Sequence, residues 1–229
     1  MSRTPLVVSM SLVLFTCFNL AARAEAPSIP GSPGSAQEEP SLSLRVADLV
    51  ERNDVEGLRA LGPQTLPALV FLYDTGDEAR RTRIAQLLYA LEWPSLEAEK
   101  SLMRDIRTDN VELRLAVQYA LGRISSDPQV VETLLDTLEN DPSPLFRDKA
   151  ACALAYDQIH LKKPEKVRLY EGLIQALSNP EPQVQAVTIQ ALSILTGQTK
   201  GFHPLLPPER KQRSIDMWER WLAEYRDGL

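Results

Sequence analysis

The stretch Thr108–Ile124, TDNVELRLAVQYALGRI, shows most clearly the unit that recurs along this chain. Its apolar residues follow helical spacing, and it ends in Ala120-Leu121-Gly122. Further Ala-Leu pairs begin at Ala60, Ala90, Ala153 and Ala191, so the successive offsets are 30, 30, 33 and 38 residues. A period in this range is typical of stacked supersecondary units and not of one globular core.

The residues between these landmarks predict antiparallel helix hairpins. Turn and capping residues separate the apolar stripes, as at Asn53-Asp54, Ser95, Asp127-Pro128 and Asn140-Asp141-Pro142. A short helix closes at Gly62, and the other stripes span residues 44–50, 66–73, 84–91, 102–106, 108–124, 130–138, 146–154, 170–177 and 184–195. We therefore expect an all-α fold, an α-solenoid of stacked hairpins over residues 42–198. Small alanines such as Ala120, Ala150, Ala153 and Ala191 would let the helix axes approach closely.

The first 24 residues have the pattern of a secretory signal peptide. Arg3 precedes an apolar run from Leu6 to Leu20, and Ala22-Arg23-Ala24 forms an A-x-A site with cleavage expected after Ala24. A membrane anchor is the alternative, but the run is short and includes four polar residues. Leu14-Phe15-Thr16-Cys17 also resembles a lipobox, in which Cys17 would be lipidated. Residues 25–41 are rich in Pro, Gly, Ser and Glu and predict a flexible linker.

The charge balance argues against general nucleic-acid binding. The formal net charge is -6, with 25 basic and 31 acidic residues. Removal of residues 1–24 takes away Arg3 and Arg23 and no acid, which leaves 23 basic residues and a charge of -8. Nucleic-acid binding needs clustered positive charge, so we expect no nucleic-acid partner, although a small basic patch stays compatible with this balance.

The repeat itself resembles a known family. In Leu134–Ala155 the turn has Asp141-Pro142, Arg147 follows six residues after the Asp, and an Ala-rich helix comes next. This order resembles a HEAT repeat of the bacterial HEAT-like (PBS-lyase-like) proteins, over roughly residues 54–196. Asp77 and Arg83 match as well, whereas Thr108 replaces the Asp before Arg114. Asn179 and Gln185 replace both residues in the last repeat.

The equivalent positions Arg83, Arg114, Arg147 and Gln185 are candidate partner-binding residues. Three arginines at the starts of successive helices would form a ladder of positive charge facing an anionic partner. The alternative is that each arginine pairs with a turn carboxylate, such as Asp141 or Asp109, and keeps neighbouring repeats in register.

No catalytic constellation is evident, so we do not expect an enzyme. The sequence has no Gly-rich phosphate loop, no G-x-S-x-G and no H-E-x-x-H motif. His160 and His203 lie 43 residues apart, which predicts neither a metal site nor a cofactor. Cys152 would be the one cysteine of the exported chain, and we interpret it as a small buried apolar residue.

The C-terminal segment, residues 199–229, predicts a loop and a cap helix. Leu195-Thr196-Gly197-Gln198, the Gly201–Pro204 loop and a Trp-rich helix resemble the tail of certain exported bacterial HEAT-repeat proteins. Lys200 and His203 depart from the acidic residues of that pattern. The helix places one group of side chains on one face: Ile215, Trp218, Leu222 and Tyr225, with Trp221 beside them. This face either caps the open end of the stack or docks on a partner or membrane surface.

These observations predict a non-catalytic, protein-binding scaffold of the cell envelope, periplasmic or extracellular, with a protein or peptide partner. One alternative is a lyase-type or enzyme-accessory protein, because some HEAT-like repeats occur in bilin lyases. Export counts against it, since chromophore attachment in that family resembles a cytoplasmic process. Another alternative is a lipid-anchored envelope protein modified at Cys17.

Overall fold

The predicted helices are the main elements of the computed structural model, which describes residues 41–229. Over these residues the fold is all-α and contains no strand. The elements are the 3-10 helix η1 (Pro63–Thr65) and α1 (Leu42–Glu51), α2 (Val55–Leu61), α3 (Leu66–Thr75), α4 (Glu78–Leu91), α5 (Leu96–Met103), α6 (Val111–Ile124), α7 (Pro128–Asn140), α8 (Pro144–Tyr156), α9 (Lys163–Ala176), α10 (Pro182–Thr196) and α11 (Pro208–Asp227). The predicted signal peptide, its site at Ala24, Cys17 and nearly all of the linker lie outside the described residues.

Local capping chemistry fixes where several helices begin. The Asp54 carboxylate accepts a hydrogen bond from the Gly57 amide at 2.8 Å, and Ser95 caps α5 in the same way. At the start of α7 the Asp127 carboxylate accepts from the Gln129 amide at 2.8 Å, with Pro128 in the first turn. Each side-chain acceptor satisfies an amide that has no partner within the helix. The starts predicted at these three residues are confirmed.

Helix α5 is shorter than predicted. We expected it to include Ile106, but it ends at Met103, and residues 104–107 form turns. In these turns Asp105 is buried and accepts hydrogen bonds from Tyr73 and Arg81 on the preceding helices. These tertiary hydrogen bonds offset the backbone hydrogen bonds that a further helical turn would have formed.

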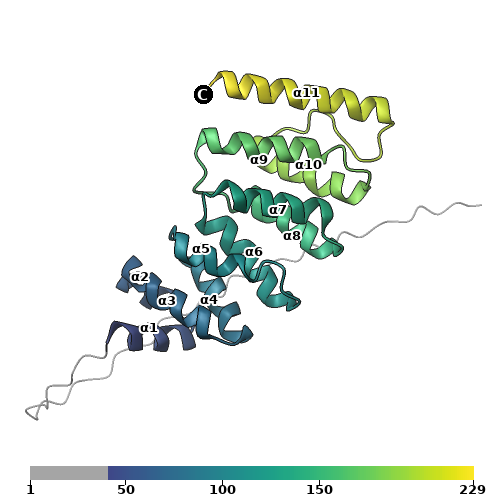
Figure 1. Ribbon diagram of the computed structural model, residues 1–229. Coiled ribbons are helices and arrows are strands. Elements are labelled where there is room, and N and C mark those ends of the chain that lie inside the picture. Colours follow the sequence, from purple (N-terminus) through teal and green to yellow (C-terminus); the bar gives the residue numbers. More distant parts are fainter. Residues whose placement is uncertain (1–40) are drawn as a thin grey trace, which may run out of the picture. The chain divides into compact units, whose positions relative to one another are not determined.

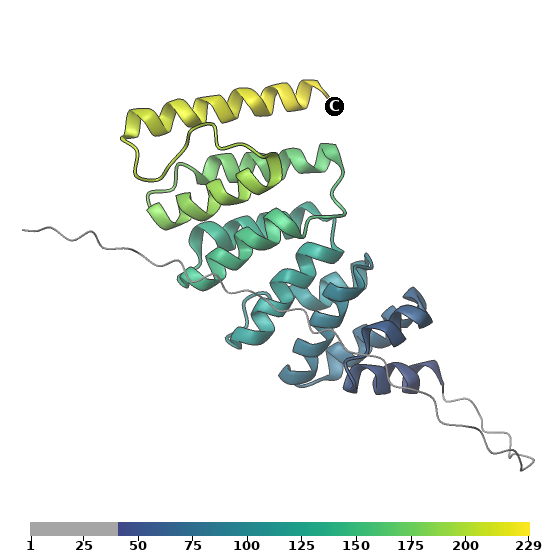
Figure 2. The same cartoon turned by 180° about the vertical axis from the view of Figure 1, so that it is seen from behind.

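The helices pack mainly against near neighbours in the sequence (Figure 1). Helix α4 packs on α6, α6 on α8, and α8 on α10, and we call these four helices the even layer. On the other side α3 packs on α5, α7 on α9, and α9 on α11. Figure 2, from behind, shows α11 as the last helix at one end of the described part, opposite α1. The hydrophobic core lies between the two sets of helices.

Small residues line the close contact between α6 and α8. A Cβ added at Gly122 of α6 would lie 3.0 Å from the Asp157 Cβ and 3.2 Å from the Ala153 carbonyl oxygen. Ala120, Ala150 and Ala153 are themselves fully buried. Larger side chains at these positions would force α6 and α8 apart, because buried interiors are close-packed.

Ala153→Arg tests this packing. The variant should lose at least about 3 kcal/mol of unfolding free energy, because it both overpacks the contact and buries a charge. Tyr156→Arg, on the exposed side of the same helix, is the matched control and should melt almost as the parent does. Thermal unfolding followed by circular dichroism provides the measurement. An Ala153→Arg melt within a degree or two of the parent would contradict the packing described here.

Candidate functional site

The candidate residues Arg83, Arg114, Arg147 and Gln185 lie in the N-terminal halves of the four even-layer helices. Each bonds to a residue from another element or turn. Arg83 Nη1 lies 2.6 Å from Glu51 Oε2, and Arg147 Nη1 lies 2.7 Å from Glu181 Oε2. The hydrogen-bonded pair Arg114–Asp141 joins α6 to the turn before α8. Gln185 donates to the Asn179 carbonyl at 2.7 Å and accepts from Lys211 of α11 at 2.9 Å.

Like Arg147, Arg114 is buried. Its guanidinium lies 3.8 Å from the centre of the Phe146 ring, and its Nε donates to the Ile106 carbonyl at 3.1 Å. The Arg114 side chain is 11% exposed and that of Asp141 only 2%. A buried guanidinium with its donors occupied inside the chain cannot face a partner without breaking these bonds.

The geometry therefore favours the second interpretation, in which the arginines join neighbouring units. Arg147 and Gln185 are buried like Arg114, and Arg83 is the most exposed of the four. In two cases the partner is a carboxylate just before the next even-layer helix. Arg114 pairs with Asp141 before α8, and Arg147 pairs with Glu181 before α10. Binding of an external partner by these four residues stays a prediction that no observation here tests.

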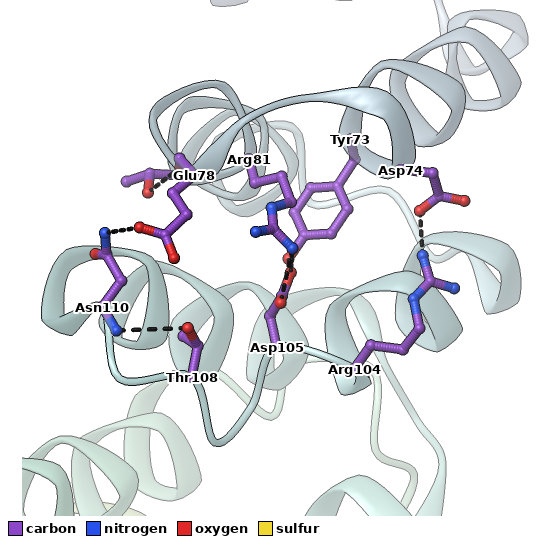
Figure 3. A network of polar contacts seen from close by, with 9 residues as sticks. Tyr73, Asp74, Glu78, Arg81, Arg104, Asp105, Thr108 and Asn110 are labelled. Carbon is purple, nitrogen blue, oxygen red and sulfur yellow. Dashed lines mark hydrogen bonds and ion pairs between the residues drawn. The ribbon is translucent and has the colours of Figure 1, made fainter.

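Sequence reasoning missed a buried polar network between α3, α4 and the turn after α5 (Figure 3). The Tyr73 hydroxyl donates to Asp105 Oδ2 at 2.7 Å, and Arg81 Nη1 lies 2.9 and 3.0 Å from the two carboxylate oxygens. Burial, with the neighbouring Asp105 charge, raises the pKa of Tyr73 above its usual value. The phenol thus stays protonated as a donor, which suits a structural role.

A second unforeseen network joins the C-terminal ends of α4, α6 and α8. Arg123 donates to Asp157 at 2.5 Å, to Glu92 at 2.8 Å and to the Tyr89 hydroxyl at 2.9 Å. Its guanidinium also lies 4.7 Å from the centre of the Tyr89 ring. Burial raises the pKa of Asp157, although the Arg123 hydrogen bond opposes that shift. One cation thereby connects three successive even-layer helices.

Beside this network the even layer presents partly exposed aromatic and apolar side chains. Tyr89 of α4 and Tyr119 of α6 meet edge to face with ring centres 6.1 Å apart. Cys152 of α8 borders a shallow depression with Val187 and Ile194 of α10. We call these five residues the even-layer face. The depression holds only about 10 Å³, far below the volume of a small-molecule pocket.

We interpreted Cys152 as a small buried apolar residue, but it is only partly buried. Burial and the Asp148 charge raise the pKa of its thiol. A raised pKa leaves little thiolate at neutral pH, which argues against a nucleophilic role.

The aromatic face of α11 packs inside the protein. Trp218 is fully buried, and Ile215 and Leu222 are each 6% exposed. Tyr170 of α9 meets Trp221 and Tyr225 edge to face, with ring centres 5.0 and 5.1 Å away. This arrangement favours the cap interpretation for Ile215, Trp218, Trp221, Leu222 and Tyr225 over a docking face.

Neither a metal-binding cluster nor a membrane-spanning helix is present in the part of the chain that the structure describes. No group of three or more His, Cys, Asp or Glu side chains in residues 41–229 is arranged to hold a metal ion. Among the helices described there, none has the length and apolar character needed to cross a membrane.

Comparison with known proteins adds no assignment. No protein-family model matches the chain, and no curated protein matches it. Functional inference therefore rests on the chemistry of the described residues.

Breaking the buried Arg114–Asp141 pair should destabilise the fold strongly. Arg114→Ala leaves the Asp141 carboxylate buried without its cation, which we expect to cost about 3–5 kcal/mol. Arg107→Ala is the matched control, because the Arg107–Asp136 pair is exposed and worth about 0–1 kcal/mol. Denaturant unfolding measures both free energies. Equal losses in the two variants would refute a special role for the buried pair.

Tryptophan fluorescence tests the cap interpretation of α11. In a Trp93→Phe/Trp221→Phe variant only Trp218 remains, and its emission should be blue-shifted and resistant to iodide, because the indole is fully buried. Denaturant should shift the emission to the red. Red, freely quenched emission from the folded variant would instead show that this face is open to a partner.

Proposed function

We propose that this protein is a non-catalytic binding scaffold of the cell envelope, with its helices arranged as a HEAT-like solenoid. The packing of α4 on α6, α6 on α8 and α8 on α10 supports this arrangement, since stacked units that contact only their neighbours characterise solenoids. The envelope location rests on the sequence of residues 1–24, which reads as a signal peptide and lies outside the described residues.

The observation that carries the proposal is the even-layer face. Tyr89, Tyr119, Cys152, Val187 and Ile194 come from the four even-layer helices and stay partly exposed. Tyrosine supplies a large, stiff contact area with a polar tip, and for that reason it is common at the centres of protein interfaces. The shallow depression between α8 and α10 suits a protein or peptide surface better than a small ligand.

Paired charges elsewhere support a scaffold role as well. Arg114, Arg123 and Arg147 form ion pairs with carboxylates of this chain, and these pairs connect neighbouring even-layer helices. A rigid frame of this kind lowers the entropic cost of binding, because the exposed side chains are already positioned.

Affinity capture from envelope extract, followed by reconstitution with the purified partner, tests the proposal. The parent chain is compared with Tyr119→Glu on the even-layer face. Leu96→Glu, a change of the same kind at an exposed position of α5, is the matched control. We expect Tyr119→Glu to weaken binding by at least about tenfold, or ~1.4 kcal/mol, and the control to bind as the parent does.

All variants must first melt cooperatively. A partner that binds Tyr119→Glu as tightly as the parent would remove the even-layer face from the binding site. Failure of the parent to retain any protein, even after cross-linking, would count against the scaffold itself.

A further inference from the structure

A second surface, at the C-terminal end, differs from the rest of the protein in charge. A groove with a volume of about 440 Å³ lies between the 197–207 loop and α11. Figures 1 and 2 show this loop running beside the start of α11. Four cations line the groove, and Leu206 and Met217 are the apolar residues between them. We call Lys200, Arg210, Arg213 and Arg220 the groove cations.

The three arginines of the groove lie on one flank of α11. Arg210, Arg213, Met217 and Arg220 follow one another at intervals of three or four residues, which places them in a row along the helix. The row spans about 15 Å at 1.5 Å per residue. Leu205, beside the groove residue Leu206 in the loop, is 81% exposed.

The groove arginines have no carboxylate partner within the described residues, and this sets them apart. The twelve other arginines from Arg52 onward each form an ion pair with an Asp or Glu: Arg52, Arg59, Arg80, Arg81, Arg83, Arg104, Arg107, Arg114, Arg123, Arg147, Arg168 and Arg226. Asp216 also lines the groove, but its carboxylate accepts from Gln212 at 2.8 Å. Because the Gln212 amide is neutral, Asp216 offsets one of the four groove cations, and the groove keeps an excess of positive charge in a chain of net charge -6.

The loop side of the groove is held in place. Lys200 has a left-handed backbone with φ of 49°, which is uncommon for a residue other than glycine. Its ammonium lies 5.7 Å from the centre of the buried Trp218 ring, within the range of a cation–π contact. The contact with the Trp218 ring holds the Lys200 ammonium on the loop side of the groove.

We propose that this groove binds an acidic peptide segment of a protein partner, with an apolar side chain among its carboxylates. Arginine suits this ligand, because its planar guanidinium binds a carboxylate through two parallel hydrogen bonds. Leu206 and Met217 offer a contact for the apolar side chain. The inference takes from the proposed function only that the partner is a protein, and it uses a different surface from the even-layer face.

Two other anionic partners fit less well. A bilayer is flat on this scale, whereas the groove cations surround a hollow, and the acidic remainder of the chain would be repelled by an anionic membrane. A nucleic acid would meet only four cations on a protein with 31 acidic residues. Both enter the test as competing outcomes.

Fluorescence anisotropy with the labelled octapeptide EELEEMEE tests the proposal on the purified full chain. We expect saturable binding that weakens as salt rises from about 50 mM to about 300 mM, because exposed charges are screened. Arg210→Glu/Arg213→Glu should weaken binding by at least about tenfold. Lys100→Glu/Lys166→Glu, with the same change in net charge away from the groove, should stay within about twofold of the parent.

Three results would overturn the proposal. The first is no binding of the octapeptide at low salt, and the second is an equal loss in the two double variants. The third is tighter, groove-dependent binding of phosphatidylglycerol vesicles or of single-stranded RNA than of the peptide. Tyr119→Glu should leave peptide binding unchanged, so a failure of the even-layer scaffold and a failure of the groove are distinguishable.

Discussion

The close contact between the backbones of α6 and α8 is the constraint on which the described fold depends. Gly122 and Ala153 meet there, and a Cβ on the glycine would fit only if its neighbours shifted. The small residues set how far apart the two helices lie, and this spacing brings Arg123 within reach of Asp157 and Arg114 within reach of Asp141. The polar networks are therefore consequences of the packing, which they then hold in register.

Because packing places the polar networks, the sequence predicts the fold better than it predicts the candidate site. Apolar spacing and capping residues are local signals, so Asp54, Ser95 and Asp127 begin helices as predicted. The predicted end of α5 was wrong, because the hydrogen bonds of Asp105 with Tyr73 and Arg81 override the helical pattern after Met103. No local sequence pattern predicts a contact between residues about thirty positions apart.

The charged residues show the same limit. The sequence marks Arg83, Arg114 and Arg147 as equivalent, yet their partners are Glu51, Asp141 and Glu181, which stand in different relations to the repeat. The groove cations are scattered over residues 200–220 and match no motif. Their distinguishing property, the lack of carboxylate partners within the described residues, is visible only once the other arginines have been placed. In retrospect, Arg210, Arg213 and Arg220 at helical intervals were the available signal.

The distribution of ion pairs also determines where the folded chain opens. The most buried pair, Arg114–Asp141, lies near the middle of the described part, and Arg81–Asp105 is partly buried, whereas Arg80–Glu51 near one end and Arg226–Glu171 near the other are exposed. Water and ions compete with exposed pairs far more than with buried ones. We therefore expect transient openings to begin at the two ends and the amides of α6 to be among the last to exchange their hydrogens. The middle helices act as the durable part of the molecule, and the ends as its adaptable parts.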